Sequence, residues 1–342
     1  MVEMTAAAAH RRADEILTNT RQLCEPILRE AISSLPEPLR LMGGYHFGWW
    51  DSGGVPTLAQ PGKSLRPALT ICAAAACGGA PLSAVTAAAA VELVHNFTLL
   101  HDDVMDADQN RRGRPTVWKL WGVPDAILLG DALHALAVRT LVAGLPDRLA
   151  TSAVSRLEMT VIEMCRGQHE DCRFGADRRV DVGEYARMAM AKTGSLMGCA
   201  CALGALCADA DAAAVSRMTT FGRELGMAFQ FVDDLIGIWG DPSVTGKPAN
   251  DLSRRSMSLP VVAALDSGTH AASELAAMYH SGSETASMDT ERAAALVESA
   301  GGRRRALRDA EQRVRAAIAA LTDVSTAQDL VALAHLASRR DR

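Results

Sequence analysis

Apolar residues recur with helical spacing through most of the chain. This spacing predicts long helices over Leu82–Asp106, Asp125–Ala143, Asp147–Cys165, Val182–Leu206 and Asp211–Trp239. Residues that commonly start helices lie near the beginning of each, at Pro81, Pro124, Pro146, Asp181 and Asp211. Runs of β-branched residues are scarce, and we find no convincing hairpin signal. The pattern therefore predicts an all-α protein.

The composition narrows the class of protein further. The chain has 342 residues, of which 49% are hydrophobic and only 4% aromatic. This is enough to bury a large core, in one large domain or two small ones. A formal net charge of −5 argues against a nucleic-acid partner, because binding to a phosphate backbone needs a basic face. Charged residues, Gly, Pro or Thr interrupt every apolar run, so no transmembrane segment is expected.

The N-terminus and the cysteines indicate the compartment. Acidic Glu3 comes early and Arg11 and Arg12 follow the alanines, which is the wrong order for a secretory signal. The eight cysteines form no CxxC pair, and several lie in alanine-rich stretches, as expected for small buried thiols in a reducing cytosol. We therefore expect a cytoplasmic protein.

Two acidic clusters end apolar helical stretches. In "HDDVMDADQNRRGRPT", Asp102 and Asp106 share one helical face, and Asp103 is displaced by about 100° and can support them. In "FQFVDDLIGIWGD" the acids are Asp233, Asp234 and Asp241. Carboxylates so close repel each other, and oxygen-only ligands select Mg²⁺, with Mn²⁺ as the alternative. A single such cluster also occurs at solvated helix ends. Two clusters predict metal ions that grip a diphosphate between facing helices.

Cationic residues lie between and around these acids. They are Lys63 and Arg66 in "GKSLRP", the pair Arg111 and Arg112, Lys192, and Lys247 in "TGKP". Arginine suits bidentate contact with phosphate, and lysine acts as a point charge. Any one of them could be an ordinary surface charge, but together with the acids they indicate a diphosphate site.

The ordered motifs resemble those of the trans-isoprenyl diphosphate synthases, or polyprenyl synthetases. They run from "GKSLRP" through "ELVHNFTLLHDDVMD", "RRGRPT", "CRGQHED", "AKTGSL", "FQFVDDLIG" and "GDPSVTGKP" to "SLPVV". The resemblance implies an all-α, isoprenoid synthase-type helical bundle around a deep apolar cavity, usually homodimeric. It implies one domain over 1–342, with the core motifs in 62–262 and a variable helical part in 263–342.

The resemblance also implies roles for individual residues. Asp102 and Asp106 resemble ligands to two of three Mg²⁺ ions and Asp233 a ligand to the third, with Asp171, Asp234 and Asp241 as further metal candidates. Isopentenyl diphosphate would contact Lys63, Arg66, His95 and Arg112. The allylic diphosphate would contact Arg111, Lys192, Gln230 and Lys247, while Gln168 lines the site and Thr193 helps to hold the carbocation. The implied reaction is ionisation of the allylic diphosphate, attack by isopentenyl diphosphate and loss of a proton.

Two departures from the family pattern leave other functions open. Gly237 stands where the second acidic motif usually has an aspartate, so "DDLIGIWGD" also approximates the second metal motif of class I terpene cyclases. Ser256 and Met257 stand where basic residues usually precede "SLP", and Arg254 or Arg255 could substitute for them. The alternatives are a terpene cyclase or a non-catalytic subunit of a heteromeric synthase. A cyclase needs no isopentenyl pocket, and the residues of that pocket are all present, so chain elongation is favoured.

Residues beneath the first acidic motif bear on product length. Thr98, four residues before Asp102, lies one turn or about 6 Å deeper and is small. Phe97 is bulky and rotated partly away from it. In the family, one aromatic at this fifth position before the motif resembles the pattern of C20 synthases, whereas two adjacent aromatics resemble C15 ones. We therefore expect geranylgeranyl diphosphate, with farnesyl diphosphate as the alternative product and simple core packing as the alternative role of Phe97.

Overall fold

A computed structural model describes residues 6–57, 62–174, 180–241, 249–280, 288–323 and 326–338. Apart from one two-stranded hairpin and an isolated bridge, the regular structure in these ranges is helical, which confirms the predicted all-α class. The chain forms two compact units. Unit 1 comprises residues 1–161, 199–219 and 323–333, and unit 2 comprises residues 162–198, 220–322 and 334–342. A single domain over 1–342 stays a prediction.

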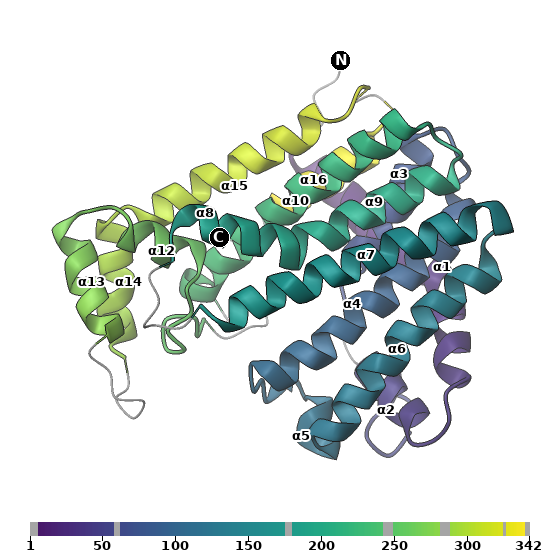
Figure 1. Cartoon of the computed structure of the whole chain (residues 1–342), viewed down its shortest axis with the longest axis horizontal. Coiled ribbons are helices and arrows are strands. Elements are labelled where there is room, and N and C mark those ends of the chain that lie inside the picture. The colour runs from purple at the N-terminus through teal and green to yellow at the C-terminus, as the bar shows by residue number, and fades with distance from the viewer. Residues whose placement is uncertain are drawn as a thin grey trace. The chain divides into compact units, whose positions relative to one another are not determined.

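The elements that lie wholly in unit 1 come from the N-terminal half of the chain. They are α1 (Ala6–Ser33), α2 (Leu39–His46), α3 (Leu65–Ala76), the 3-10 turn η1 (Pro81–Ala84), α4 (Val85–Met105), β1 (Asn110–Arg111), β2 (Arg114–Pro115), α5 (Val117–Trp121) and α6 (Val123–Gly144). Helix α4 lies beside α6 and also contacts α1 and α3 (Figure 1). Residues 87–94 of α4 are all buried, and most of them are alanine or valine, so neighbouring helices can approach closely.

Unit 2 holds the second group of helices. They are α8 (Val182–Ala189), the π-helical turn η2 (Met190–Gly194), α12 (Leu259–Leu265), α13 (His270–His280), α14 (Thr290–Ser299) and α15 (Gly302–Ala319). Helix α12 packs against α13, α14 and α15 (Figure 1). Tyr185, Phe231 and Tyr279 are large aromatic side chains in the core of unit 2, and each is at most 2% exposed. Helices with residues in both units are α7 (Asp147–Cys172), α9 (Ser195–Cys207), α10 (Ala212–Trp239) and α16 (Gln328–Ser338).

The five predicted helices exist, with one interruption that the apolar pattern did not reveal. The segment expected as one helix over Val182–Leu206 is α8 and α9 joined by the π-helical turn. Such turns insert one extra residue into a helix and are frequent at functional sites. Lys192 and Thr193 both lie in this turn. Helix α7 also continues to Cys172, beyond its predicted end.

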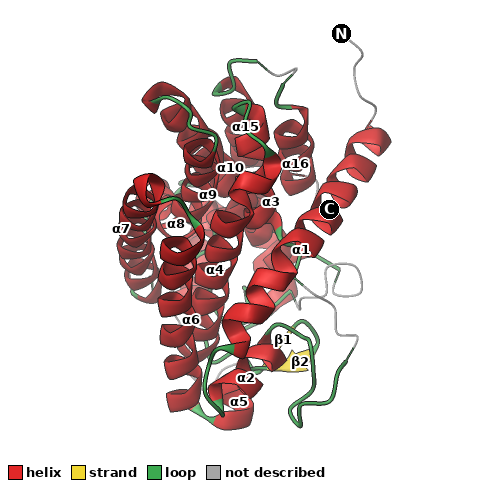
Figure 2. Ribbon diagram, turned by 90° about the vertical axis from the view of Figure 1, so that its right-hand side faces the viewer, coloured by secondary structure: helices red, strands yellow, loops and turns green. Residues whose placement is uncertain are grey.

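A short hairpin follows α4 and was not expected from the sequence. Strands β1 and β2 pair antiparallel, with Arg111 opposite Arg114 (Figure 2). Arg112 and Gly113 form its two-residue turn, with φ angles of 52° and 74°. Both angles are positive, as tight hairpin turns require, and an arginine in this region costs about 1–2 kcal/mol. The "RRGR" segment is therefore held in a defined turn, with Arg112 at its tip.

Three helices are long and apolar enough to cross a membrane by length and composition alone: Pro81–Met105, Val123–Gly144 and Val182–Cys207. The expectation that no segment is long enough is therefore wrong on those criteria. In the structure, 67%, 39% and 83% of their most apolar windows are buried inside the protein. Packing within the fold explains the apolar character of the first and third, whereas less than half of the window in Val123–Gly144, which is α6, is buried.

Candidate active site

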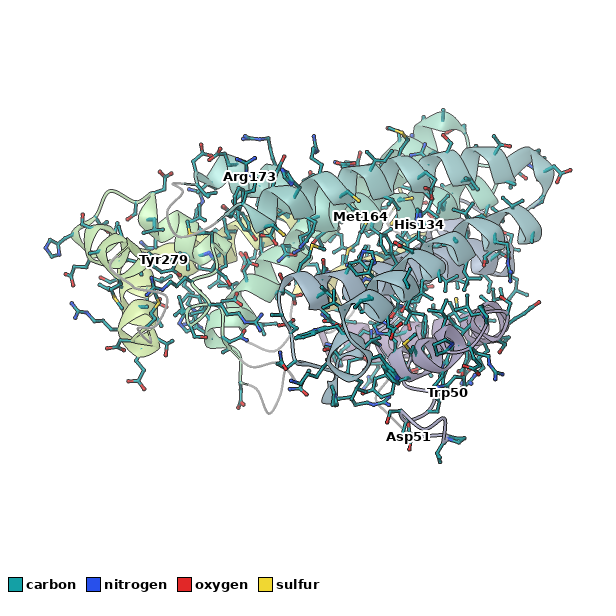
Figure 3. All side chains as sticks on the ribbon, turned by 60° about the horizontal axis from the view of Figure 1, so that its bottom comes forward. Trp50, Asp51, His134, Met164, Arg173 and Tyr279 are labelled. Carbon is teal, nitrogen blue, oxygen red and sulfur yellow. The ribbon has the colours of Figure 1, made fainter. Side chains whose placement is uncertain are left out.

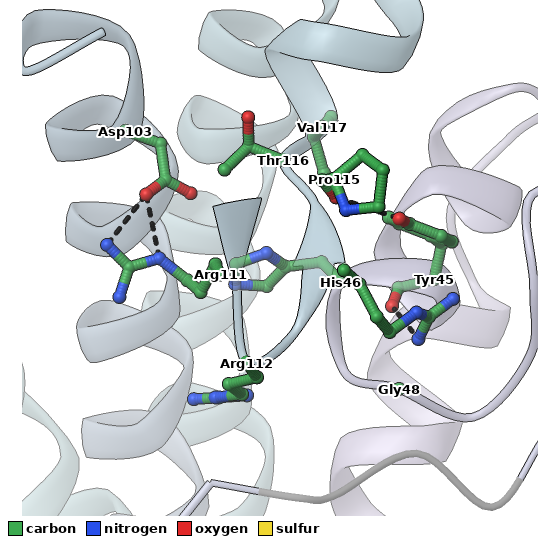
Figure 4. Close-up of a pocket in the computed structure, with 10 residues that line it drawn as sticks. Tyr45, His46, Gly48, Asp103, Arg111, Arg112, Pro115, Thr116 and Val117 are labelled. Carbon is green, nitrogen blue, oxygen red and sulfur yellow. Dashed lines mark hydrogen bonds and ion pairs between the residues drawn. The ribbon is translucent and has the colours of Figure 1, made fainter. Parts of the chain in front are cut away.

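The first acidic motif lies at the C-terminal end of α4. Asp102 is half-buried, Asp106 is exposed and caps the helix, and Asp103 is only 1% exposed. Arg111 of β1 donates to Oδ1 of Asp103 from Nε at 2.7 Å and from Nη2 at 2.6 Å (Figure 4). Oδ2 of Asp103 is buried and has no hydrogen-bond partner. Asp103 therefore anchors the hairpin through Arg111, and its role in supporting the metal ligands stays a prediction.

The hairpin closes over a polar pocket in unit 1. The side chains that line it include Tyr45, His46, Asp103, Arg111 and Arg112 (Figure 4). Arg114, in β2, also lines the pocket and donates to the carbonyls of Tyr45 at 3.2 Å and Trp50 at 2.7 Å. Trp50 lies on the loop that follows α2 (Figure 3). Arg114 therefore fastens the hairpin to α2 and its loop, while the tip residue Arg112 faces the pocket.

The predicted isopentenyl-site residues belong to a basic group in unit 1. Nη1 of Arg66 donates to Nε2 of His95 at 3.1 Å, so that nitrogen carries no proton. Burial lowers the pKa of His95 well below its usual value, and nearby Arg66 and Arg112 act in the same direction. His95 is therefore neutral. Lys63 is exposed, and Gly62 before it is close to Arg112, whose Nη2 lies 2.6 Å from the position of a Cβ on Gly62.

Glu92 and His46 belong to the same group, and neither was expected from the sequence. Asn96 donates to Oε1 of Glu92 at 3.1 Å and to the Glu92 carbonyl at 2.8 Å, which leaves its own Oδ1 to accept from Nε2 of His46 at 3.1 Å. Glu92 is 7% exposed, and its Oε2 has no hydrogen-bond partner. Burial raises the pKa of Glu92, while Arg112 and Arg66 oppose the rise. A lone glutamate in an apolar run is the sequence signal that could have identified it.

Apart from Arg111, which lies in unit 1, the predicted allylic-site residues with described positions lie in unit 2. Nζ of Lys192 lies 2.6 Å from Oδ2 of Asp171, which is near the end of α7. Gln168, one turn earlier, is half-buried on the same helix. The backbone of the π-helical turn touches neighbouring helices directly: a Cβ on Gly167 would lie 2.4 Å from the Lys192 nitrogen. Glycine at 167 thus permits the close approach that fixes Lys192.

Thr193 begins a chain of hydrogen bonds that continues into α10. Its hydroxyl donates to Oε1 of Gln230 at 2.7 Å, and Nε2 of Gln230 donates to Oδ1 of Asp234 at 2.9 Å. Oδ2 of Asp234 accepts from the Tyr185 hydroxyl and, at 2.7 Å, from the Leu259 backbone N–H. Burial raises the pKa of Asp234 to about 7. Three hydrogen bonds occupy most of the lone-pair sites of this buried carboxylate. The structure therefore favours a supporting role for Asp234, and its prediction as a metal ligand stays a prediction.

The remaining residues of the second acidic motif occupy different environments. Asp233 is half-buried on α10, and Asp241 is exposed just after its end. Gly237 lies against Asp251, whose carboxylate fills the space beside it. Lys247 lies outside the described residues. Arg255, one of the two suggested substitutes for the missing basic residues, donates to the Tyr279 carbonyl at 3.0 Å and so contributes to the packing of unit 2.

Phe97 has aromatic partners on both sides. Its ring stacks on His134 of α6, with centroids 5.3 Å apart and planes 21° apart, and meets His101 edge-on at 4.9 Å. His134 in turn lies 2.8 Å and 3.0 Å from the carboxylate oxygens of Glu158. Thr98 donates its hydroxyl to the His95 carbonyl at 2.8 Å in its own helix. Phe97 is therefore part of a fixed stack below the first acidic motif.

The acids of α4 and α7 lie in the last turns of these helices, where the helix dipole disfavours negative charge. Arg111 offsets this for Asp103, and Lys192 does so for Asp171. Within the described ranges, no three His, Cys, Asp or Glu side chains are grouped as a ready-made metal site. The donor set nevertheless fits Mg²⁺, which typically takes one or two carboxylates plus substrate phosphates. The buried Oδ2 of Asp103, which lacks a partner, also favours a cation nearby. The prediction that both acidic motifs line one cavity stays a prediction.

Comparison with known proteins identifies the family. Residues 55–297 match the family model for polyprenyl synthetase. The chain is 55% identical to the geranylgeranyl diphosphate synthase of Mycobacterium tuberculosis over 327 residues, which cover 95% of this chain and 93% of that one. It is 42% identical to the (2E,6E)-farnesyl diphosphate synthase of Mycobacterium bovis, over 89% and 86% of the two chains. A polyprenyl synthetase structure from Streptomyces coelicolor superposes with a TM-score of 0.87 at 41% identity, covering 94% and 98%. The chain therefore belongs to the polyprenyl synthetase family of trans-prenyltransferases, as its motifs predicted.

Proposed function

We propose that this prenyltransferase condenses isopentenyl diphosphate with an allylic diphosphate in a Mg²⁺-dependent reaction and releases geranylgeranyl diphosphate. The observation that carries the proposal is the 55% identity, over nearly the whole chain, to a geranylgeranyl diphosphate synthase. Prenyl diphosphate synthases act on prenyl diphosphates, which fixes the substrate class; the Mg²⁺ ion and the C20 product are the finer parts of the proposal. The cyclase and the non-catalytic subunit are not favoured by these relatives.

The two units contribute different residues to the proposed reaction. In unit 1, Arg66, Arg112 and Lys63 would hold the diphosphate of isopentenyl diphosphate. Neutral His95 accepts from Arg66 through Nε2, so it can only donate to a phosphate oxygen through Nδ1–H. In unit 2, Lys192 would contact the allylic diphosphate and Thr193 would face the carbon that loses it.

Charge determines how the reaction proceeds. Mg²⁺, when bound with Asp102, Asp106 and Asp233, would supply positive charge for the departing diphosphate, with three ions proposed per active site. Lys192 adds to that charge and orients the leaving group. The apolar, low-aromatic interior keeps water away from the allylic carbocation. A proton is then lost, most simply to the released diphosphate, because no side chain stands out as a base.

Product length depends on the side chains that lie beneath the first acidic motif. The Phe97–His134 stack is supported by Glu158, so it is more rigid than a single phenylalanine would be. Thr98 adds little volume, and its hydroxyl is satisfied within its own helix. We therefore propose that chain growth stops at the C20 stage, with the C15 product as the alternative.

We also propose that the protein is a cytoplasmic homodimer. Support comes from α6, whose most apolar window is only 39% buried, with Leu128 and Val142 each 56% exposed. A second copy of this chain would cover that helix. Light scattering after gel filtration should give twice the mass of one chain, and Leu128→Glu should shift the protein towards monomer.

The test of function is an incubation of purified protein with Mg²⁺, isopentenyl diphosphate and dimethylallyl, geranyl or farnesyl diphosphate, read by mass spectrometry. A C20 diphosphate that forms only when isopentenyl diphosphate is present supports the proposal. A parallel incubation contains Mg²⁺ and geranylgeranyl diphosphate alone. A terpene hydrocarbon or alcohol there would establish a cyclase instead, and no turnover in any arm would overturn the proposed activity.

A further inference from the structure

The hydrogen bonds that link Thr193 to Asp234 all donate towards Asp234, and all the residues in this chain of bonds lie in unit 2. Asp234 accepts every hydrogen bond that the structure gives it, from the Tyr185 hydroxyl, the Leu259 N–H and the Gln230 amide. It is 6% exposed, and Tyr185 and Leu259 are at most 2% exposed. We call Tyr185, Thr193, Gln230 and Asp234 the Thr193 network.

The acceptor at Asp234 determines which way the Gln230 amide faces. Oxygen and nitrogen of a glutamine amide are assigned from their hydrogen-bond partners. Because Oδ1 of Asp234 accepts, the Gln230 atom that faces it is Nε2, the donor, at 2.9 Å. Oε1 of Gln230 therefore faces Thr193, 2.7 Å from its hydroxyl oxygen. The Thr193 hydroxyl must donate its single proton to Gln230.

A threonine hydroxyl has one proton and two lone pairs. With the proton used on Gln230, the Thr193 oxygen offers only lone pairs to any other group. A lone pair stabilises an electron-poor carbon, whereas an O–H proton directed at that carbon would destabilise it. Thr193 is 6% exposed and lies in the π-helical turn beside Lys192, so few other groups compete for those lone pairs.

We propose that Asp234 and Tyr185 are positioning residues that fix the polarity of the Thr193 hydroxyl, so that its lone pairs face the allylic carbocation. The inference rests on the proposed function, and it assigns Asp234 a task other than binding metal. Tyr185 contributes by holding the Asp234 carboxylate in place through Oδ2, so that Oδ1 faces Gln230.

Asp234→Asn tests the direction of these hydrogen bonds, because it reverses them without removing any residue's hydrogen-bonding groups from the Thr193 network. The oxygen of the asparagine can still accept from Tyr185 and Leu259, but its NH₂ now faces Gln230 and donates. The Gln230 amide then turns over, its NH₂ faces Thr193, and the Thr193 proton points away. We expect kcat to fall about tenfold or more, with KM for both diphosphates within about twofold and with circular dichroism and Tm close to those of the parent.

A double-mutant cycle with Thr193→Val separates polarity from general packing. If Asp234 acts through the Thr193 hydroxyl, Asp234→Asn should cause no further loss of kcat in the Thr193→Val background. Tyr185→Phe removes one hydroxyl only and should show the same coupling to Thr193. Tyr279→Phe is the matched control, because it removes another buried tyrosine hydroxyl of unit 2, which donates to the Ser256 carbonyl at 3.4 Å. Its effect should add to that of Thr193→Val.

The outcomes separate this inference from the proposed function. If the parent protein makes prenyl diphosphate and the losses from Asp234→Asn and Thr193→Val multiply, the polarity proposal is overturned while the function stands. If Asp234→Asn leaves kcat unchanged, it is overturned as well. If Asp234→Asn does not fold, the Tyr185→Phe cycle decides in the same way. A parent with no prenyltransferase activity overturns the proposed function, and the inference fails with it.

Discussion

The carboxylate of Asp251 lies where a β-carbon of residue 237 would be. Its Oδ2 is 2.1 Å from the ideal Cβ position on Gly237, and the backbone N–H of Asp251 donates to the Gly237 carbonyl at 3.2 Å. Asp233 lies one turn before Gly237 on the same face of α10. The family's second motif usually has an aspartate at the position of Gly237. Here Asp251 places a carboxylate beside that position instead. Glycine at position 237 leaves the space that the Asp251 carboxylate occupies.

Restoring the usual aspartate should therefore harm the protein. In Gly237→Asp, the new Cβ overlaps the Asp251 carboxylate, and a second negative charge is added beside it. Overpacking of this kind costs about 1–3 kcal/mol, and we expect a loss of that size in the free energy of unfolding measured in urea. The double variant Gly237→Asp/Asp251→Gly removes the overlap and should recover most of the loss. A Gly237→Asp protein as stable as the parent would contradict this explanation of the glycine.

Shortening Phe97 should lengthen the product. Phe97→Ala removes the ring that stacks on His134 and opens space below the first acidic motif. We expect prenyl diphosphates longer than those of the parent, read as chain lengths by mass spectrometry. Phe221→Ala is the control, because that ring is also buried but belongs to α10 and takes no part in the stack. It should lower stability and leave chain length unchanged. If Phe97→Ala makes the same product as the parent, Phe97 contributes only to core packing.

The elements that local pattern determines could be predicted from the sequence. Alanine and leucine at helical spacing predicted α4, α6, α7 and α10, because each of these helices buries an apolar face. The hairpin was missed because its turn uses Arg112 at positive φ, where sequence rules expect Asn, Asp or Gly. The π-helical turn was missed because one extra residue hardly changes the apolar pattern.

The site could be predicted only in part, for a different reason. Asp233 and Asp234 look equivalent in sequence, yet a rotation of about 100° leaves Asp233 half-buried and buries Asp234 against Tyr185. Glu92, Asn96 and His46 form one chain of contacts, but His46 is 50 residues from Asn96 along the chain. Partners that distant are brought together by packing, which no local motif records.

Removing Arg111 should destabilise unit 1 strongly. Asp103 is almost fully buried, and Arg111 is the cation that pairs with it. Arg111→Met leaves a buried charge without its partner, which typically costs about 3–5 kcal/mol. The double variant Arg111→Met/Asp103→Leu removes both charges and should be more stable than Arg111→Met in urea unfolding. Arg148→Met is the control, because the side chains of its pair with Asp209 are largely exposed to solvent, and its loss should change stability little. Equal stability of Arg111→Met and the parent would rule out this role for the pair.

Stability should fall in mild acid because His46 resists protonation in the folded state. Burial lowers the pKa of His46 to about 3 from an ordinary value of 6.5, and nearby Arg112 and Arg111 add to the effect. The unfolded chain therefore binds the proton first, so stability is full above about pH 6.5 and is lost as pH falls towards about 3. The expected loss is at most about 1.4 kcal/mol for each pH unit. His95, whose pKa is lowered for the same reason, acts in the same direction.

Variants of His46 can isolate its share of this loss. His46→Gln keeps an N–H donor for Oδ1 of Asn96 but cannot titrate, so its Tm should fall less than that of the parent between pH 7.5 and 5.5. His270→Gln removes a histidine whose side chain is 89% exposed and should keep the parent's pH dependence. If His46→Gln and the parent lose the same Tm over this range, the acid sensitivity arises elsewhere. A smaller loss would show that the neutral imidazole, held between Asn96 and the arginines, makes the basic pocket sensitive to pH.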